Sequence, residues 1–279
     1  MPLIVNTNIQ SFNAQRQLSG VQLRLAKSFE KLSSGNRVNR AGDDAAGLAI
    51  SNEMEADIRG MRQAVRNAQD GVAMLNVADG SMQNMVSLLQ RVRELAVQAA
   101  NDTYDINKRR IIRTEIQQLF FEINRIADST QFNGVSLLNA SSPTEFLLQV
   151  GSGNNGNGTD VIDVASALDN LLATALFLGT AGVPHNQAAN YMLSRVDRAM
   201  GQINAQLARL GALQNRLEGV IGNLEVTIEN ISAARSRIMD TDVALETAQL
   251  TKNQILQQST LAILSQANVA PQAALRLLQ

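Results

Sequence analysis

Long heptad patterns, one in each half of the chain, most constrain what this sequence can fold into. In the second half, apolar residues recur without a gap at Val196, Ile203, Leu210, Leu217, Leu224, Ile231 and Ile238. A second pattern of the same spacing runs from Met54 to Ala96. Because such seams are buried only against other helices, they predict a mainly α protein, an elongated antiparallel helical bundle or coiled coil.

Capping residues define the long helices of this bundle. Asp43 or Asp44 can cap the first of them and complement its dipole. We expect long helices at about 44–100, 104–128 and 188–239. The predicted core of the bundle is formed by Ile58, Met61, Val65, Val72, Leu75, Leu89, Ile203, Leu210, Leu217, Leu224 and Ile231.

A further helix is expected at each end of the chain. The first ends near Leu32, before Gly35, a residue suited to the left-handed backbone past a helix end. The last follows Asp242 and ends at about Asn268, near Pro271. Antiparallel pairing places the first helix beside the last, and 44–100 beside 188–239.

The middle of the chain changes character. A strand-like run from Glu145 to Val150 precedes a loop rich in Gly and Asn at 151–158, and a second apolar run starts at Val161. This order predicts a small β-hairpin region within about 131–187. The segment 165–187 stays unassigned.

Composition excludes several functions. The chain has 24 Lys and Arg against 25 Asp and Glu, so it shows no electrostatic footprint for nucleic acid or an anionic membrane. The longest apolar run, 171–178, is too short to span a bilayer. The first fifteen residues carry no charge, so no conventional export signal is visible. Retention in the cytosol and export by a dedicated machine both remain open at this point.

The terminal helices carry more apolar surface than one partner helix can cover. Residues 253–275 contain no charged side chain, and their large apolar residues spread over more than half of the helix circumference. We therefore expect copies of the same chain to bury this surface. The predicted subunit-interface residues are Leu18, Val21, Leu25, Leu32, Ile255, Leu256, Ile263 and Leu264.

Two ordered sets of motifs resemble the terminal signatures of bacterial flagellins. The segment 32–50, LSSGNRVNRAGDDAAGLAI, is similar to the N-terminal signature, and IVNTN at 4–8 fits it too. The segment 230–242, with QILQQ at 254–258 and QAN at 266–268, resembles the C-terminal signature.

This resemblance implies a structural subunit that polymerises helically into the flagellar filament for motility, in a minimal form without large outer domains. It implies that residues 1–42 and 241–279 form an inner-tube domain and that 43–240 form a rod-shaped shaft. It also implies unfolded export through the flagellar type III apparatus to an extracellular flagellum. The implied partners are other copies of the chain, a flagellar export chaperone, and cap and junction proteins.

The segment 89–98 resembles the shaft segment through which some flagellins are detected by a Toll-like receptor. By that match, Arg91 and Leu95 contact the receptor, joined by Glu115. The alternative interpretation is that the same face packs against a neighbouring subunit. Asp79-Gly80 interrupts the first seam, either as a flexible point or as a polar break without consequence.

Catalysis is not expected. The sole histidine, His185, stands beside Pro184 in a stretch rich in helix breakers, and the chain has no cysteine, so we expect no metal, cofactor or catalytic residue. The competing functions are a hook–filament junction protein and a secreted helical effector. The junction protein would form no long homopolymer, and the effector would bind membranes.

Overall fold

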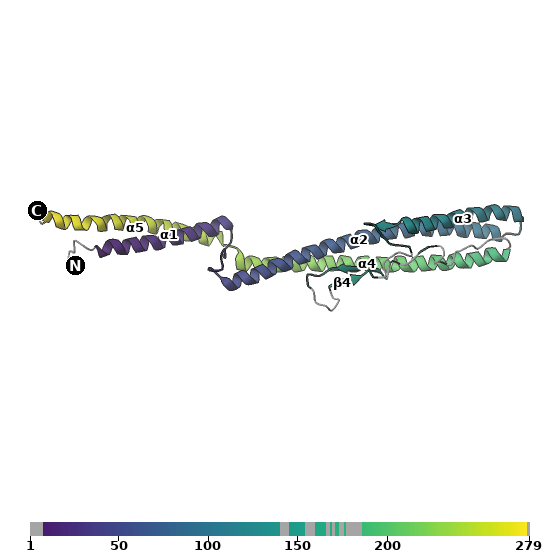
Figure 1. The fold of residues 1–279 in the computed structure, drawn as a ribbon, viewed down its shortest axis with the longest axis horizontal. Helices are drawn as coiled ribbons and strands as arrows, with labels where there is room; N and C mark the ends of the chain where they lie inside the picture. Colours follow the sequence, from purple (N-terminus) through teal and green to yellow (C-terminus); the bar gives the residue numbers. More distant parts are fainter. Residues whose placement is uncertain are drawn as a thin grey trace. The chain divides into compact units, whose positions relative to one another are not determined.

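The computed structural model describes residues 8–139, 145–153, 160–165, 168, 171, 172, 176 and 186–277, with backbone alone at 186 and 270–277. Its elements follow the order α1, α2, α3, β1, β2, β3, β4, α4, α5 (Figure 1). The predicted fold class, mainly helical with antiparallel packing and small two-stranded sheets in the middle of the chain, is confirmed.

Backbone contacts divide the chain into two compact units. Unit 1 comprises residues 1–56 and 229–279, and unit 2 comprises residues 57–228. The long helices α2, Ala45–Ala100, and α4, Asn186–Met239, contribute to both units. The tube and shaft boundaries inferred from the resemblance, at 42/43 and 240/241, fall inside unit 1 and stay a prediction.

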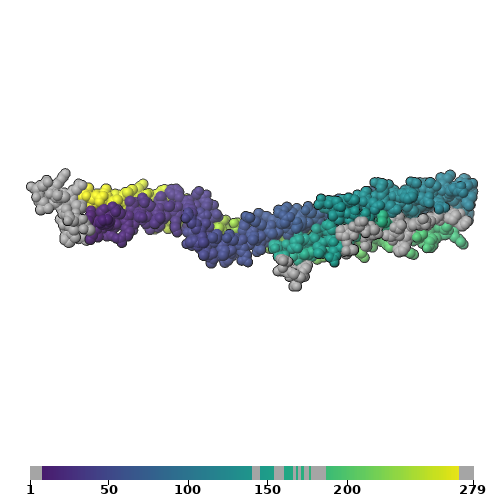
Figure 2. Space-filling view, viewed as in Figure 1, coloured from purple at the N-terminus to yellow at the C-terminus, as the bar shows by residue number. Residues whose placement is uncertain are grey.

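In unit 1, helix α1, Ile9–Ser34, packs against helix α5, Val243–Leu277. Asn8 caps α1, because its side-chain oxygen accepts a hydrogen bond from the Ser11 N–H at 3.1 Å. Gly35 ends α1 with a φ of 71°, in the left-handed conformation expected from the sequence. Figure 2 shows α1 in purple along α5 in yellow.

The predicted end of the last helix is wrong, because α5 continues through Pro271 to Leu277. A proline inside a helix has no N–H for the carbonyl four residues earlier, here that of Ala267. That carbonyl instead accepts a hydrogen bond from Asn8 Nδ2 at 2.7 Å. The partner helix therefore satisfies the backbone group that the proline leaves free.

In unit 2, α2 and α4 run antiparallel. Gln214 Nε2 donates to Asn76 Oδ1 over 2.9 Å, and Arg93 Nε donates to Asp197 Oδ1 over 2.9 Å. These two bonds are 17 residues apart on each helix, in opposite chain order. Helix α3, Ile106–Ser129, lies along α2 (Figures 1 and 2).

Local capping explains where these helices begin. Asp44 rather than Asp43 caps α2, since its Oδ1 accepts from the Gly47 N–H at 2.9 Å. Asp105 caps α3 through the Lys108 N–H at 2.8 Å. Helix α2 is continuous through Asp79-Gly80, and the Asp79 carboxylate accepts from Gln83 Nε2 on the next turn.

Two hairpins occupy the middle of the chain. Strands β1, Gln131–Phe132, and β2, Val135–Ser136, are joined by Asn133 and Gly134, both with positive φ, as a tight two-residue turn requires. Strands β3, Leu147–Gln149, and β4, Val161–Asp163, form the predicted antiparallel hairpin, with Leu148 opposite Ile162. Part of the predicted loop at 151–158 and much of 165–187 lie outside the described residues.

The β3–β4 hairpin packs on α2 within unit 2. Asn67 Nδ2 donates to the Gln149 carbonyl at 3.0 Å, and a Cβ on Gly71 would collide with the Leu148 side chain. Glycine at position 71 therefore permits the close approach of the hairpin.

The core of unit 2 follows the predicted seams closely. Leu75, Leu89 and Ile203 are completely buried. The predicted core residues that are buried are Ile58, Met61, Leu75, Leu89, Ile203, Leu210 and Leu217, and those that are half-buried are Val65, Val72 and Leu224. The predicted core residue Ile231, which belongs to unit 1, is half-buried too. Within unit 2, the α4 seam thus becomes less buried from Leu217 to Leu224.

Candidate assembly surface

Helices α1 and α5 meet along a narrow seam with alternating spacings of three and four residues. On α1 this seam comprises Ser11, Ala14, Leu18, Val21, Leu25, Ser28 and Leu32, all buried or half-buried. On α5 it comprises Glu246, Leu250, Asn253, Gln257, Thr260, Leu264 and Ala267. Most of the α5 seam is therefore polar or small, so the pair buries little apolar side chain.

Most of the large apolar residues described on α5 lie outside that seam. Ile255 and Ile263 are 61% and 58% exposed. The exposed large apolar residues of α5 are Val243, Leu245, Ile255, Leu256, Leu261, Ile263 and Val269. The single chain leaves this apolar surface of α5 uncovered, although the helix is already paired with α1.

Helix α1 adds exposed apolar residues of its own. Phe12 and Leu23 are 60% and 67% exposed, and Ile9 and Phe29 are exposed too. The sequence-based interpretation missed these four residues, because it considered only the stripe that forms the α1 seam. Their position outside that stripe is the signal that would have identified them.

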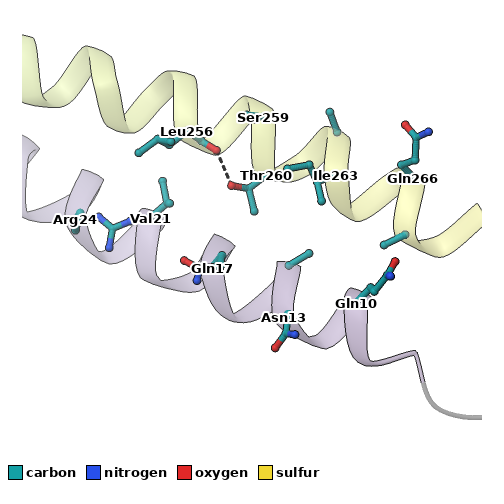
Figure 3. Close-up of a pocket in the computed structure, with 13 residues that line it drawn as sticks. Gln10, Asn13, Gln17, Val21, Arg24, Leu256, Ser259, Thr260, Ile263 and Gln266 are labelled. Atoms are coloured by element: carbon teal, nitrogen blue, oxygen red, sulfur yellow. Dashed lines mark hydrogen bonds between the residues drawn. The ribbon is translucent and has the colours of Figure 1, made fainter. Parts of the chain in front are cut away.

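A shallow groove of about 840 Å³ runs between the two helices (Figure 3). Leu256 and Ile263 of α5 line it opposite Gln17 and Val21 of α1. The Thr260 hydroxyl is turned back to the Leu256 carbonyl of its own helix at 2.6 Å. Leu256 and Ile263 both remain exposed, so α1 covers these apolar side chains of the groove only in part.

Of the predicted interface residues, five lie in the seam within one chain: Leu18, Val21, Leu25, Leu32 and Leu264. Three are exposed: Ile255, Leu256 and Ile263. The prediction did not separate residues that hold the helix pair together from residues that face outward. The outward set is the candidate for contact between copies.

Polar contacts join α1 and α5 near both ends of the helix pair. Ser11 Oγ donates to Asn268 Oδ1 at 2.9 Å beside the Asn8 bond, and Lys31 Nζ lies 3.7 Å from a Glu246 carboxylate oxygen at the other end. These contacts fix the register of α1 against α5, and with it the residues that remain outside.

The segments that lead out of α1 and into α5 are also joined. The Thr241 N–H donates to the Gly35 carbonyl at 2.9 Å, and Arg37 Nη2 donates to the Ile238 carbonyl at 2.6 Å. The Lys27 side chain donates a hydrogen bond to the Asp43 carboxylate at 3.3 Å. This bond, together with the one from the Arg40 N–H, lowers the pKa of Asp43 below its ordinary value of 3.8.

The structure brings together two of the three residues matched to receptor recognition. Arg91 Nη2 donates to Glu115 Oε1 at 2.8 Å, and Arg91 also pairs with Glu94 at 3.0 Å. These carboxylates raise the pKa of the Arg91 guanidinium. Leu95, in contrast, is only 2% exposed and belongs to the core of unit 2.

Comparison with known proteins decides the family. The bacterial flagellin N-terminal helical region matches residues 5–142, and the flagellin C-terminal helical region matches residues 193–278. A flagellin from Halalkalibacterium halodurans is 43% identical over 278 residues, covering 99% of this chain and 100% of the relative. This chain belongs to the flagellin family.

Two further flagellins support this family assignment. The flagellin of Bacillus subtilis is 39% identical to this flagellin and covers 99% of each chain. The crystal structure of Bacillus cereus flagellin superposes with a TM-score of 0.50 at 28% identity, covering 61% of this chain and 94% of that one.

This flagellin is a structural subunit of the flagellar filament, not an enzyme, and with 279 residues it is a minimal form without a large variable domain. The junction-protein and effector alternatives lose their support, because relatives that match the whole chain are flagellins.

The described part of this flagellin contains no group of three or more His, Cys, Asp or Glu residues that could hold a metal ion. Within the same residues, no helix is long and apolar enough to cross a membrane. His185, considered above as a metal ligand, lies outside the described residues.

Proposed function

We propose that this flagellin polymerises by burying the outward apolar faces of α1 and α5 against the same helices of neighbouring copies. The observation that carries this proposal is the arrangement of α5, which turns a largely polar seam to α1 and leaves Ile255, Leu261 and Ile263 exposed. Residues 1–42 and 241–279 then form the inner tube of the filament, and 43–240 form the shaft.

Burial of these side chains supplies the driving force. Each large apolar side chain that is removed from water contributes about 1.5–3 kcal/mol. Phe12, Leu23 and Phe29 add to the α5 residues, and every subunit repeats the gain. The contact joins different surfaces of successive copies, so it continues as a helix rather than closing into a small ring.

The weakness of the isolated helix pair fits unfolded export through the flagellar type III apparatus. Ala14 and Val21 are the buried apolar residues of the α1 seam, and Ala267 is the one fully buried on the described part of the α5 seam. A unit with so few buried apolar contacts opens at low cost. The same exposed faces suit an export chaperone before assembly, and cap and junction proteins at the filament ends.

For receptor recognition, we propose that Arg91 and Glu115 present the polar contact. Leu95 acts from the core by supporting the helix surface beneath them. An Arg91→Ala protein is expected to lose signalling through a Toll-like receptor while remaining folded. Undiminished signalling by that protein would exclude this part of the proposal.

Seeded electron microscopy tests assembly. Full-length protein and a version that lacks residues 1–42 and 241–279 are each added to short filament fragments. Long filaments from the full-length chain alone are expected, with the truncated protein remaining soluble and helical by circular dichroism. Elongation by the truncated protein would show that the terminal helices are not the driving surface.

A further inference from the structure

An exposed stripe of α3 carries bases and large apolar side chains. Its residues recur at intervals of three and four, so they lie on one side of the helix. Ile106 and Phe121 are 62% and 65% exposed. Arg110 and Arg113 are exposed as well, and they make no ion pair or side-chain hydrogen bond with another described residue. We call this the basic stripe, and it comprises Ile106, Arg110, Arg113, Gln117 and Phe121.

A stripe of α4 in the same unit has the opposite character. Glu218 is exposed and makes no ion pair or side-chain hydrogen bond with another described residue. Val226 is 57% exposed, and nothing lies within 4 Å of a Cβ placed on Gly211 or Gly222. We call this the acidic stripe, and it comprises Gly211, Asn215, Glu218, Gly222 and Val226.

The two stripes have the same spacing. Each advances by four, three, four and four residues, so two parallel helices can match them position by position. Arg113 then lies opposite Glu218, and Phe121 lies opposite Val226. Gln117 lies opposite Gly222, where the absence of a side chain leaves room for it. One register therefore joins opposite charges, joins two apolar side chains, and sets a long side chain against an open position.

The two stripes cannot meet within one copy. Arg91 of α2 pairs with Glu115 of α3, and Arg93 of α2 pairs with Asp197 of α4. Residues 115 and 197 therefore lie at nearly the same height along unit 2. The matched register places residue 115 opposite residue 220, which is about 20 residues further along α4, or roughly 30 Å at about 1.5 Å per residue. A second copy must supply one of the two stripes.

We infer that the basic stripe of α3 in one copy packs against the acidic stripe of α4 in a neighbouring copy. This inference rests on the proposed polymerisation and adds to it a contact between the two copies of unit 2. Helices α3 and α4 both run opposite to α2 (Figure 1), so they are parallel in copies that share one polarity, as the copies of a helical filament do. The opposite charges fix the register, which shifts each copy by roughly 30 Å along the next. Because every copy carries both stripes, the contact repeats without closing.

Reversal of the central charge pair tests the contact. Arg113→Glu and Glu218→Arg each place like charges opposite each other, so each is expected to raise the critical concentration for seeded assembly about tenfold. The double variant Arg113→Glu/Glu218→Arg restores the pair with its charges exchanged, so the critical concentration should return to within about twofold of the parent. Lys108→Glu reverses an exposed charge of α3 outside the stripe and, as the control, should leave the critical concentration unchanged. Sedimentation measures these concentrations, and circular dichroism establishes that every variant is folded.

Engineered cysteines test the register, because the chain contains no cysteine of its own. The variant Phe121→Cys/Val226→Cys is assembled and then oxidised by air with copper(II) phenanthroline. Filaments are expected to give a ladder of covalent oligomers on a non-reducing gel, and unassembled protein only monomers, since the two positions face each other only between copies. Ile106→Cys/Val226→Cys is the matched control and should give no ladder, because residue 106 lies 15 residues from residue 121 on α3.

The outcomes separate this contact from the proposed function. Normal assembly of either single reversal, or a double variant that does not recover, overturns the pairing of Arg113 with Glu218. Filaments of Phe121→Cys/Val226→Cys that give no ladder, or a ladder from the cysteine control, overturn the parallel register. Failure of the parent protein to assemble overturns the proposed polymerisation and this contact together.

Discussion

Asn8 Nδ2 donates a hydrogen bond to the Ala267 carbonyl over 2.7 Å, across the two helices at opposite ends of the sequence. The same side chain caps α1 through its oxygen. Pro271 has no N–H, so the Ala267 carbonyl lacks the hydrogen-bond donor that an ordinary helix would supply. One side chain therefore begins α1 and allows α5 to pass a proline.

This relationship predicts that Asn8→Asp is costly only when Pro271 is present. Aspartate keeps the capping oxygen but loses the donor, which leaves the Ala267 carbonyl without its partner at a cost of about 1 kcal/mol. In a Pro271→Ala background the N–H of residue 271 is restored and the cost is expected to vanish. Hydrogen exchange of the α5 amides measures the loss of stability caused by Asn8→Asp in each background. Equal losses in the two backgrounds would contradict the role assigned to the Asn8 donor.

The decreasing burial along α4 predicts unequal costs for two leucines of the same seam. Leu217→Ala should destabilise unit 2 by about 2–5 kcal/mol, because its side chain is completely buried. Leu224→Ala should cost roughly half as much, since Leu224 remains half-buried. Urea unfolding measures both values. A larger loss at Leu224 would mean that the seam is organised differently.

Two glycines of α2 should respond to alanine in opposite ways. Nothing lies within 4 Å of a Cβ placed on Gly80, so Gly80→Ala is expected to stabilise unit 2 by about 0.5–1 kcal/mol through helix propensity. Gly71→Ala gains the same propensity but pushes Leu148 aside, so its net stability should not rise. Thermal unfolding compares the two variants. Destabilisation by Gly80→Ala would indicate that the Asp79-Gly80 break has a structural role.

The lowered pKa of Asp43 predicts an acid-sensitive contact. A carboxylate whose pKa is lower in the folded state stabilises that state above its unfolded pKa, and the contribution is lost as the pH falls below 3.8 through the folded value. Lys27→Met removes the main cause, so the Asp43 pKa should rise toward 3.8. An NMR titration of the Asp43 carboxyl measures this, and an unchanged pKa in Lys27→Met would exclude the Lys27 contact as its cause.

The heptads predicted the helices and most of the core because their periodicity directly reflects burial. Leu210 and Leu217 are buried as the spacing requires, and Gly35 ends α1 as expected. Local rules were sufficient for these residues. The β1–β2 hairpin was not predicted as a separate element, since strands of two residues carry no periodic signal.

Long-range contacts explain the failures. Pro271 indicated a helix end, and only the Asn8 side chain, far away in sequence, makes the continuation of α5 acceptable. The terminal interface was predicted as one set, because an apolar residue on a helix does not reveal which partner covers it. The polar composition of the α5 seam, with Asn253 buried and Ile255 exposed, appears only once α1 and α5 are paired.

The most direct test of the account is seeded assembly of Ile255→Asp beside Ile255→Leu, followed by sedimentation and electron microscopy. Ile255 is exposed on α5 in the single chain, so neither substitution should disturb the α1–α5 pair. Ile255→Asp is expected to reduce polymer at least about tenfold, because assembly would bury its charge, whereas Ile255→Leu keeps the apolar surface and should polymerise like the parent. Normal filaments from Ile255→Asp would contradict the claim that the outward apolar face of α5 drives assembly.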